Sequence, residues 1–317
     1  MKNERVVDLR SVFLKAMAIA FAALLVFTLA SCSSNGGGDA KGSQSNPVII
    51  GVVGASDAQY VELKKAAEAE GIYIDYKDFS DYPSVNPALT EGSLDLNQFQ
   101  HIQYLAKYNV DANADLVPYA ATAVFPISLY GNLTENVKQL SDVKDGAQIA
   151  IPNDNTNQAR ALFVLNNAGL IKFKSEGLLL PTPADIDEAN SKVKVLPVDA
   201  SQTAIQVADP KVAAAVVNND YVKNLPDGVA DNVLTTESAD SDGAKPYINI
   251  FVSRTEDQDN ETYLKIADIF NTNADVQAAL AEESGGADKL KVIGNLYSKA
   301  DLQEILAQQI ELYKETL

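Results

Sequence analysis

Apolar and polar positions follow strand and helix periods in alternation along most of the chain. Residues 48–53, VIIGVV, form a continuous apolar run that is typical of a buried strand. A helical pattern follows at 59–70, which Ser56 can cap and Gly71 can end. Residues 72–79, IYIDYKDF, alternate as a second strand. This β-α-β order predicts a parallel sheet and therefore an α/β fold.

The same rhythm returns in the rest of the chain, without any internal repeat. The pattern predicts further strands over 148–152, 193–198, 212–220 and 247–254. It predicts amphipathic helices over 156–169, 261–272, 274–284 and 299–317. The polar stretch 235–246 is expected to be a loop. The length favours two domains.

The first 31 residues have the pattern of a signal peptide. Four basic residues precede an apolar run of 13 residues at 16–28, which is too short to span a bilayer. The run leads into LASC, which ends at Cys32 and resembles the bacterial lipobox. That resemblance implies cleavage before Cys32 and a lipid on its sulfur. A plain signal peptide with an incidental cysteine is the alternative.

Residues 32–46 are expected to be a flexible, lipid-anchored linker. Gly, Ser and Asn dominate this segment, and Ala40 is its one aliphatic residue. Such a composition cannot bury enough apolar surface to fold. The linker would hold an extracytoplasmic body close to the membrane, and stable anchoring takes more than one lipid chain.

The charge of the chain excludes some classes of partner. It carries 43 acidic and 25 basic residues, a net charge of −18. The predicted signal peptide contains four of the basic and two of the acidic residues, so the remainder is more acidic still. Nucleic-acid binding needs a basic footprint, and adsorption to anionic lipid by charge does too. The acidity therefore indicates solubility and neither of these functions.

Catalytic and metal-binding motifs are missing from the sequence. Cys32 is the only cysteine and His101 the only histidine, which rules out an HExxH site, a disulfide within the chain and cysteine-ligated zinc. There is no GxSxG elbow and no P-loop, and Gly51-x-x-Gly54 falls far short of a dinucleotide motif. We therefore expect no enzyme activity, no cofactor and no metal site.

Three polar clusters lie at the edges of predicted elements: FQHIQY at 99–104, PNDNTNQAR at 152–160, and Asn218. In the second cluster, Asp154, Asn155 or Thr156 can cap the following helix. Free N–H groups at a helix start attract a carboxylate, and Arg160 can add two parallel hydrogen bonds. The alternative is an ordinary helix cap beside a solvated arginine.

The other two clusters complete a possible binding site. Asn218 comes at the carboxyl end of a predicted strand and offers an acceptor to an ammonium group, unless it is only a turn residue. Phe99, His101 and Tyr104 can form a mainly apolar wall, or they can pack in the core. Together the clusters predict a site for a zwitterion with an apolar side chain.

Five segments identify a family: 78–105, 126–131, 149–174, 214–222 and 246–254. In these segments the chain resembles the NlpA/MetQ family of lipoproteins, the methionine-binding receptors of ABC importers. The resemblance implies a two-lobed periplasmic-binding-protein-like fold of type II, with the ligand in a cleft between the lobes. It implies one lobe from 47–125 with 246–317, a second from 126–245, and a hinge near residues 125 and 245.

The resemblance also implies the role of single residues and of partners. It assigns ligand binding to Tyr82, Phe99, His101, Tyr104, Asn157, Arg160 and Asn218. It implies a monomeric receptor that binds L-methionine and delivers it to a membrane permease with a cytoplasmic ATPase. The alternatives are another apolar amino acid, a methionine-containing dipeptide, or a surface interaction lipoprotein without a role in transport.

Three departures from the family pattern concern specificity for the ligand side chain. Gln103 replaces the proline of the family's FQHxPY motif, and we expect it to add a polar group near the pocket. Residues 199–210 lack the usual LPRSL pattern. Asp220 stands where the family often has asparagine or a small polar residue.

Overall fold

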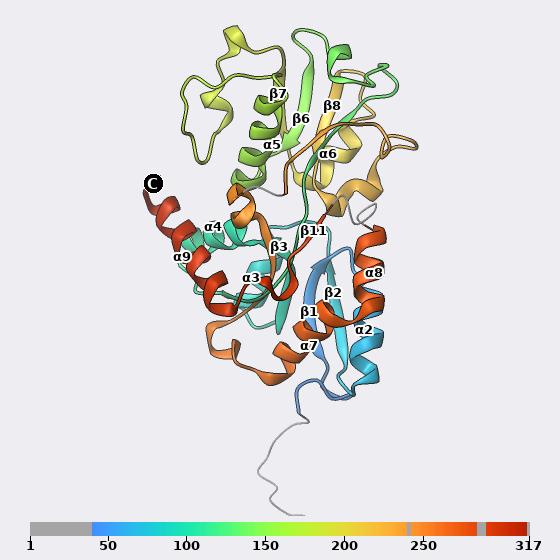
Figure 1. Cartoon of the computed structure of the whole chain (residues 1–317), viewed down its shortest axis with the longest axis vertical. Coiled ribbons are helices and arrows are strands. Elements are labelled where there is room, and N and C mark those ends of the chain that lie inside the picture. Colours follow the sequence, from blue (N-terminus) through green and yellow to red (C-terminus); the bar gives the residue numbers. More distant parts are fainter. Residues whose placement is uncertain (1–39, 240–241, 284–289, 316–317) are drawn as a thin grey trace, which may run out of the picture. The chain divides into compact units, whose positions relative to one another are not determined.

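The computed structural model describes residues 40–239, 242–283 and 290–315. Residues 41–317 form one compact unit, and two β-sheets inside it define two lobes (Figure 1). The larger lobe is built on a six-stranded sheet and the smaller lobe on a five-stranded sheet. The predicted two-lobed α/β fold is thus confirmed.

The sheet of the larger lobe has the strand order β11-β4-β10-β3-β1-β2. β1 lies parallel to both β2 and β3, whereas β10 runs antiparallel to β3 and β4. The strands are β1 (Val48–Val53), β2 (Ile74–Phe79), β3 (Leu96–His101), β4 (Val117–Val124), β10 (Ile248–Ser253) and β11 (Lys291–Val292).

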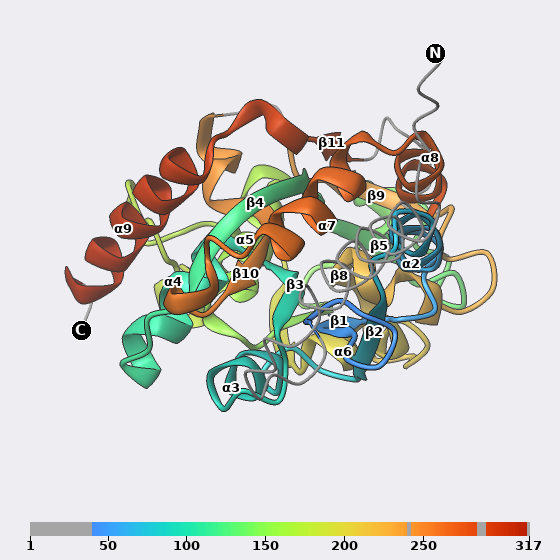
Figure 2. The ribbon, with the colours of Figure 1, turned by 90° about the horizontal axis from the view of Figure 1, so that it is seen from below.

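Helices cover both faces of this sheet (Figure 2). One face packs against α2 (Ala58–Ala69), α7 (Glu261–Thr272) and α8 (Ala274–Glu283). The opposite face packs against α3 (Val85–Thr90), α4 (Ile102–Ala112) and α9 (Lys299–Glu315). Aromatic rings fill the first of these layers, where Phe251 meets Phe270 edge-on at 5.4 Å between ring centroids.

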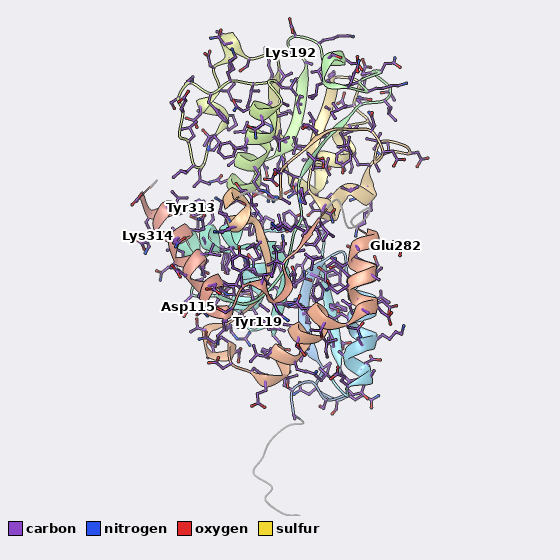
Figure 3. The ribbon with its side chains drawn as sticks, viewed as in Figure 1. Asp115, Tyr119, Lys192, Glu282, Tyr313 and Lys314 are labelled. Carbon is purple, nitrogen blue, oxygen red and sulfur yellow. The ribbon has the colours of Figure 1, made fainter. Side chains whose placement is uncertain are left out.

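The smaller lobe has the strand order β7-β6-β8-β5-β9. Its strands are β5 (Ser128–Gly131), β6 (Gln148–Pro152), β7 (Lys194–Val198), β8 (Val212–Val217) and β9 (Val233–Thr236). α5 (Asn155–Asn167) packs on one face and α6 (Ala200–Gln206) on the other. In Figure 3, Lys192 marks the outer end of this lobe and Tyr119 lies within the larger lobe.

Short 3₁₀ helices occupy several connections. They are η1 (Leu140–Asp142), η2 (Pro183–Asp185), η3 (Glu188–Asn190), η4 (Asn219–Asn224), η5 (Asp242–Tyr247), η6 (Thr255–Asp257) and η8 (Gly294–Leu296). The chain passes from the larger lobe to the smaller between β4 and β5, and returns between β9 and β10 through η5. The predicted hinge positions lie in these two connections, and movement about them stays a prediction.

Several predicted bounds agree with the structure. β1, β6 and α7 match their predicted ranges. The predicted cap of α2 is wrong, because Asp57 and not Ser56 is its N-cap residue. Residues 199–210, which depart from the family pattern, include α6, whose N-cap Asp199 accepts a hydrogen bond from the backbone N–H of Ser201 at 2.9 Å.

Part of the predicted linker is ordered. Lys41 donates from Nζ to Asp95 Oδ2 at 2.9 Å, and the carbonyl of Gly42 accepts from the N–H of Tyr73 at 2.8 Å. Residues 41–46 therefore pack against the larger lobe, which corrects the expectation of flexibility over 32–46. Cys32 and the predicted signal peptide lie outside the described residues. Among the described helices, none is long and apolar enough to cross a membrane.

Gly51 in β1 has a packing role. A Cβ added there would lie 2.4 Å from Leu94 Cδ1 and 3.1 Å from Val85 Cγ1. Both neighbours are buried: Val85 is the first residue of α3, and Leu94 follows the turn after that helix. The close approach of Leu94 and Val85 to β1 explains why position 51 is a glycine, whereas the Gly51-x-x-Gly54 spacing did not.

We expect Gly51→Ala to lower the free energy of unfolding by about 1–3 kcal/mol, because the added methyl group overpacks a closed core. Urea unfolding measures the change. As a control, Lys77→Ala on the exposed side of β2 should stay within about 0.5 kcal/mol of the parent. Equal stability of Gly51→Ala and the parent would show that Leu94 and Val85 move aside freely.

Candidate functional site

One pocket collects all seven residues predicted to bind ligand. It lies between the two lobes, and the empty space among its lining side chains is about 400 Å³ when the open solvent at its mouth is included. Its lining consists of Tyr82, Phe99, Gln100, His101, Tyr104, Phe125, Ile127, Asn157, Arg160, Asn218, Asn219, Asp220 and Asn249. Segments far apart in sequence thus meet at the carboxyl ends of β3, β6 and β8.

His101 ends β3 and caps α4 with its own side chain. Its Nδ1 accepts from the N–H of Tyr104 at 3.1 Å, so the ring proton is on Nε2. That Nε2 faces Asn157 Oδ1 at 3.4 Å. Burial, reinforced by the charge of Arg160, holds the pKa of His101 well below its usual range. The histidine is therefore a neutral donor and a helix cap.

Across the part of the chain that the structure describes, no group of three or more His, Cys, Asp or Glu side chains is placed to hold an ion.

Aromatic rings form one wall of the pocket. Tyr82 lies 5.9 Å from Phe99 and 6.1 Å from Tyr104, measured between ring centroids. Phe99 and Tyr104 meet edge-on at 5.8 Å. These rings enclose apolar space suited to an uncharged side chain. The predicted wall thus exists, and His101 borders it 6.2 Å from Tyr104.

Asn157 joins the polar side chains of the site. The N-cap of α5 is Asp154, which accepts from the backbone N–H of Asn157 at 2.9 Å and from its Nδ2 at 3.1 Å. This pair leaves Asn157 Oδ1 as an acceptor on the pocket side. It accepts from Asn218 Nδ2 at 2.9 Å and from Arg160 Nη1 at 3.3 Å. The helix cap thereby orients the hydrogen-bonding groups that face the pocket.

Arg160 is buried and already paired, contrary to the solvated alternative. Its Nε and Nη2 donate to the two carboxylate oxygens of Glu237 at 3.2 and 2.5 Å. Nη2 also reaches the carbonyl of Phe125 at 2.9 Å, and the guanidinium lies 4.4 Å from the ring centre of Tyr247. The expected pair of parallel bonds therefore goes to a residue of the protein, and not to a ligand.

Glu237 changes the electrostatics of the site. Burial acts to lower the pKa of Arg160, but the charge and hydrogen bonds of Glu237 outweigh burial and raise it. The sequence pattern missed Glu237 because it lies in a polar stretch with many acidic residues. Arg160 Nη1 carries two N–H groups and uses one of them to donate to Asn157 Oδ1. Its second N–H can therefore donate one hydrogen bond to a ligand.

Asn218 presents an acceptor to the pocket. Its Nδ2 is used by Asn157, whereas its Oδ1 is buried and has no hydrogen-bond partner among the described residues. A buried acceptor of this kind is costly unless a donor reaches it. An ammonium group in the pocket would supply that donor.

Two residues behave differently from the sequence prediction. Asn249 lines the pocket although only its segment, 246–254, was noted. Gln103 does not line the pocket, because its Nε2 donates to Gln309 Oε1 of α9 at 3.4 Å. The expectation that Gln103 adds a polar group near the ligand is therefore wrong.

Comparison with known proteins agrees with this arrangement. The model of the NlpA lipoprotein family matches residues 48–292. The chain belongs to the NlpA lipoprotein family. A relative in this family, the D-methionine-binding lipoprotein MetQ of Salmonella typhi, is 35% identical over 77% of this chain and 88% of its own length.

Solved structures similar to this NlpA lipoprotein share its fold. Protein PG110 from Staphylococcus aureus has a TM-score of 0.73 and 34% identity, covering 83% of this chain and 99% of that protein. A nutrient binding protein from Burkholderia cenocepacia, solved bound to methionine, has a TM-score of 0.68 and 30% identity, covering 77% and 99%.

The lowered pKa of His101 predicts a pH dependence of folding. Below the ordinary histidine pKa of about 6.5, the unfolded chain binds a proton that the folded protein does not. Stability should therefore fall as the pH drops from about 7 to 5, by at most about 1.4 kcal/mol per pH unit. Urea unfolding of the parent and of His101→Gln at each pH measures the slope, which should be shallower in the variant. Identical slopes would mean that His101 is protonated in the fold.

Proposed function

We propose that this NlpA lipoprotein is the substrate-binding protein of an ABC transporter and that it binds methionine between its lobes. One observation carries the proposal: the aromatic wall faces a hydrogen-bonded set of Asn157, Arg160 and Asn218 within one interlobe pocket. Such a pocket has an apolar side for a thioether chain and a polar side for the α-amino-acid group. The names of its relatives, among them a methionine transporter's substrate binding protein from Streptococcus pneumoniae, support this ligand.

The proposed pose follows from the chemistry of the walls. The side chain of the ligand lies against Tyr82, Phe99 and Tyr104. The carboxylate accepts from the remaining Nη1 hydrogen of Arg160. The ammonium donates to Asn218 Oδ1, and the neutral ring of His101 lies beside the ligand with its Nε2 directed at Asn157 Oδ1. The protein carries out no reaction in this scheme, and it delivers the ligand to a permease driven by an ATPase.

Calorimetry with the purified body, residues 33–317, tests the ligand. Native mass spectrometry first shows whether a small molecule has co-purified, and unfolding and refolding removes it. L-methionine should then bind with one molecule per protein. D-methionine belongs in the same series because the names of several relatives specify it. Other apolar amino acids and methionine-containing dipeptides complete the series. The proposal would be refuted if the protein bound none of these compounds.

Asn218→Ala should weaken methionine binding about 10- to 100-fold, because it removes a hydrogen bond to a charged group. The matched control is Asn224→Ala, an exposed residue at the other end of η4, which should bind as the parent does. If both variants keep the parent's affinity, the ammonium group is not held by Asn218.

We propose that residues 1–31 are removed as a signal peptide and that Cys32 then carries the lipid that holds the protein at the outer face of the membrane. Because residues 41–46 pack against the larger lobe, the tether proposed from composition shortens to 32–40. The lobes proposed to close on the ligand are 47–125 with 246–317, and 126–245. The protein is proposed to act as a monomer.

Cys32→Ala should abolish lipidation, which a clickable palmitate analogue fed to the producing bacterium detects on gels of the whole-cell protein. The variant should leave the membrane fraction, whereas Ser33→Ala should be labelled and sedimented like the parent. Cys32 is the only cysteine of the chain. Label that remained on Cys32→Ala would therefore mean that the lipid is attached to a residue of another type.

A further inference from the structure

A second cavity lies directly beside the ligand pocket, and the proposed function gives it no role. We call it the side cavity. The empty space among its lining side chains is about 840 Å³ when the open solvent at its mouth is included, against about 400 Å³ for the ligand pocket on the same basis. Its lining comes from both lobes and consists of Pro83, Asn86, Tyr104, Lys107, Tyr108, Asp111, Asp154, Asn155 and Thr156.

The wall between the two cavities is thin. Tyr104 lines both of them, and among the described residues no other is common to the two linings. On either side of it, neighbours in sequence face opposite cavities. Tyr82 lines the ligand pocket, whereas Pro83 lines the side cavity, and Asn157 and Thr156 divide in the same way. Tyr104 is thus the member of the aromatic wall that has empty space behind it.

Contacts on both sides place the Tyr104 ring in this wall. On the pocket side its centroid lies 6.1 Å from that of Tyr82 and 5.8 Å from that of Phe99. On the cavity side Asp154 acts on the same side chain, since burial, and then the negative charge of Asp154, raises the pKa of Tyr104. The backbone is held as well, because the N–H of Tyr104 donates to His101 Nδ1 at 3.1 Å.

The side cavity is suited to an uncharged chain. Lys107 forms an ion pair with Asp111, one helical turn further along α4. The carboxylate of Asp154 accepts from Thr156 Oγ1 at 2.9 Å. The charged groups of the lining thus already have partners within it, and Tyr108 adds an aromatic ring. A chain that entered this space would therefore gain affinity from the burial of its own apolar surface.

We infer that the Tyr104 ring limits the length of the side chain that the ligand pocket accepts, and that the side cavity is the space which it closes off. This inference rests on the proposed function and deepens it. It makes Tyr104 a specificity-determining residue that favours a side chain of methionine's length over longer thioether or alkyl chains. A longer chain has to displace the ring, whereas loss of the ring joins the two cavities.

The test compares L-methionine with S-octyl-L-homocysteine, which has the same amino-acid group and an octyl chain in place of the methyl group. The measured quantity is the ratio of their affinities, from calorimetry at one molecule per protein. The parent should prefer methionine about tenfold or more, because the longer chain overpacks a closed pocket. Tyr104→Ala should lower this preference about tenfold or more, because each methylene group that leaves water for the side cavity adds about fourfold in affinity.

Three variants serve as matched controls. Tyr104→Phe keeps the ring and should keep the parent's preference for methionine. Phe99→Ala removes a ring of the same wall that does not border the side cavity, and it frees the room of fewer carbon atoms than the octyl chain adds. Tyr108→Ala changes the side cavity without touching the ligand pocket. Phe99→Ala and Tyr108→Ala should therefore also keep the parent's preference.

Each outcome decides for or against the inference. A parent that binds the octyl probe as tightly as methionine, or more tightly, overturns it, while the proposed function stands. Tyr104→Ala with an unchanged preference overturns it too, and so does an equal loss of preference in Phe99→Ala, which would show that any enlargement of the wall has this effect. A parent that binds neither probe removes the proposed function and the inference together. Circular dichroism confirms folding, and Tyr104→Leu carries the same test if Tyr104→Ala does not fold.

Discussion

The burial of one guanidinium constrains the whole site. Arg160 is 2% exposed, and a charge so far from water must be matched inside the protein. Glu237 matches it, and the same guanidinium contacts Asn157 and the ring of Tyr247. Burial, reinforced by the charge of this guanidinium, lowers the pKa of His101 and keeps the imidazole neutral. Because Glu237 compensates the charge of Arg160, that side of the pocket is close to neutral, and the groups left to contact a ligand there are hydrogen-bonding side chains and the aromatic wall.

The two-sheet architecture places these groups at one point. Strands β3, β6 and β8 each end at the interlobe pocket. His101 is the last residue of β3, and Asn157 and Asn218 follow β6 and β8. Because each residue also stands at or near a helix start, its backbone is held by the cap geometry. Contacts from η4 to the larger lobe lie beside the same residues, so ligand contacts and lobe contacts share one short segment.

The sequence predicted the elements in which one period dominates, and it missed several strands, among them β3, whose buried side chains are mostly polar. β1 is uniformly apolar and α7 is strongly amphipathic, so both were predicted with their bounds. β3 is completely buried yet reads LNQFQH, and no strand was predicted there. Its amides bond to one another and to Asn86, with Asn86 Nδ2 to Gln100 Oε1 at 2.8 Å and Asn97 Nδ2 to Asn86 Oδ1 at 2.9 Å. Hydropathy cannot show such a network, because each amide alone is typical of a surface residue.

The sequence alone determined the α/β pattern, the family and seven of the residues that line the pocket, because helix and strand periods and motif spacing are local properties of the chain. The tertiary structure decided which hydrogen-bond partners the polar side chains in and near the pocket have. It showed that the Arg160 guanidinium donates two hydrogen bonds to Glu237, 77 positions away. It also showed that Gln103 donates to Gln309 of α9 and that Tyr82 donates to Asp220. These contacts depend on which distant segments meet when two sheets pack, and the energy of a buried charge depends on that neighbourhood more than on its own sequence.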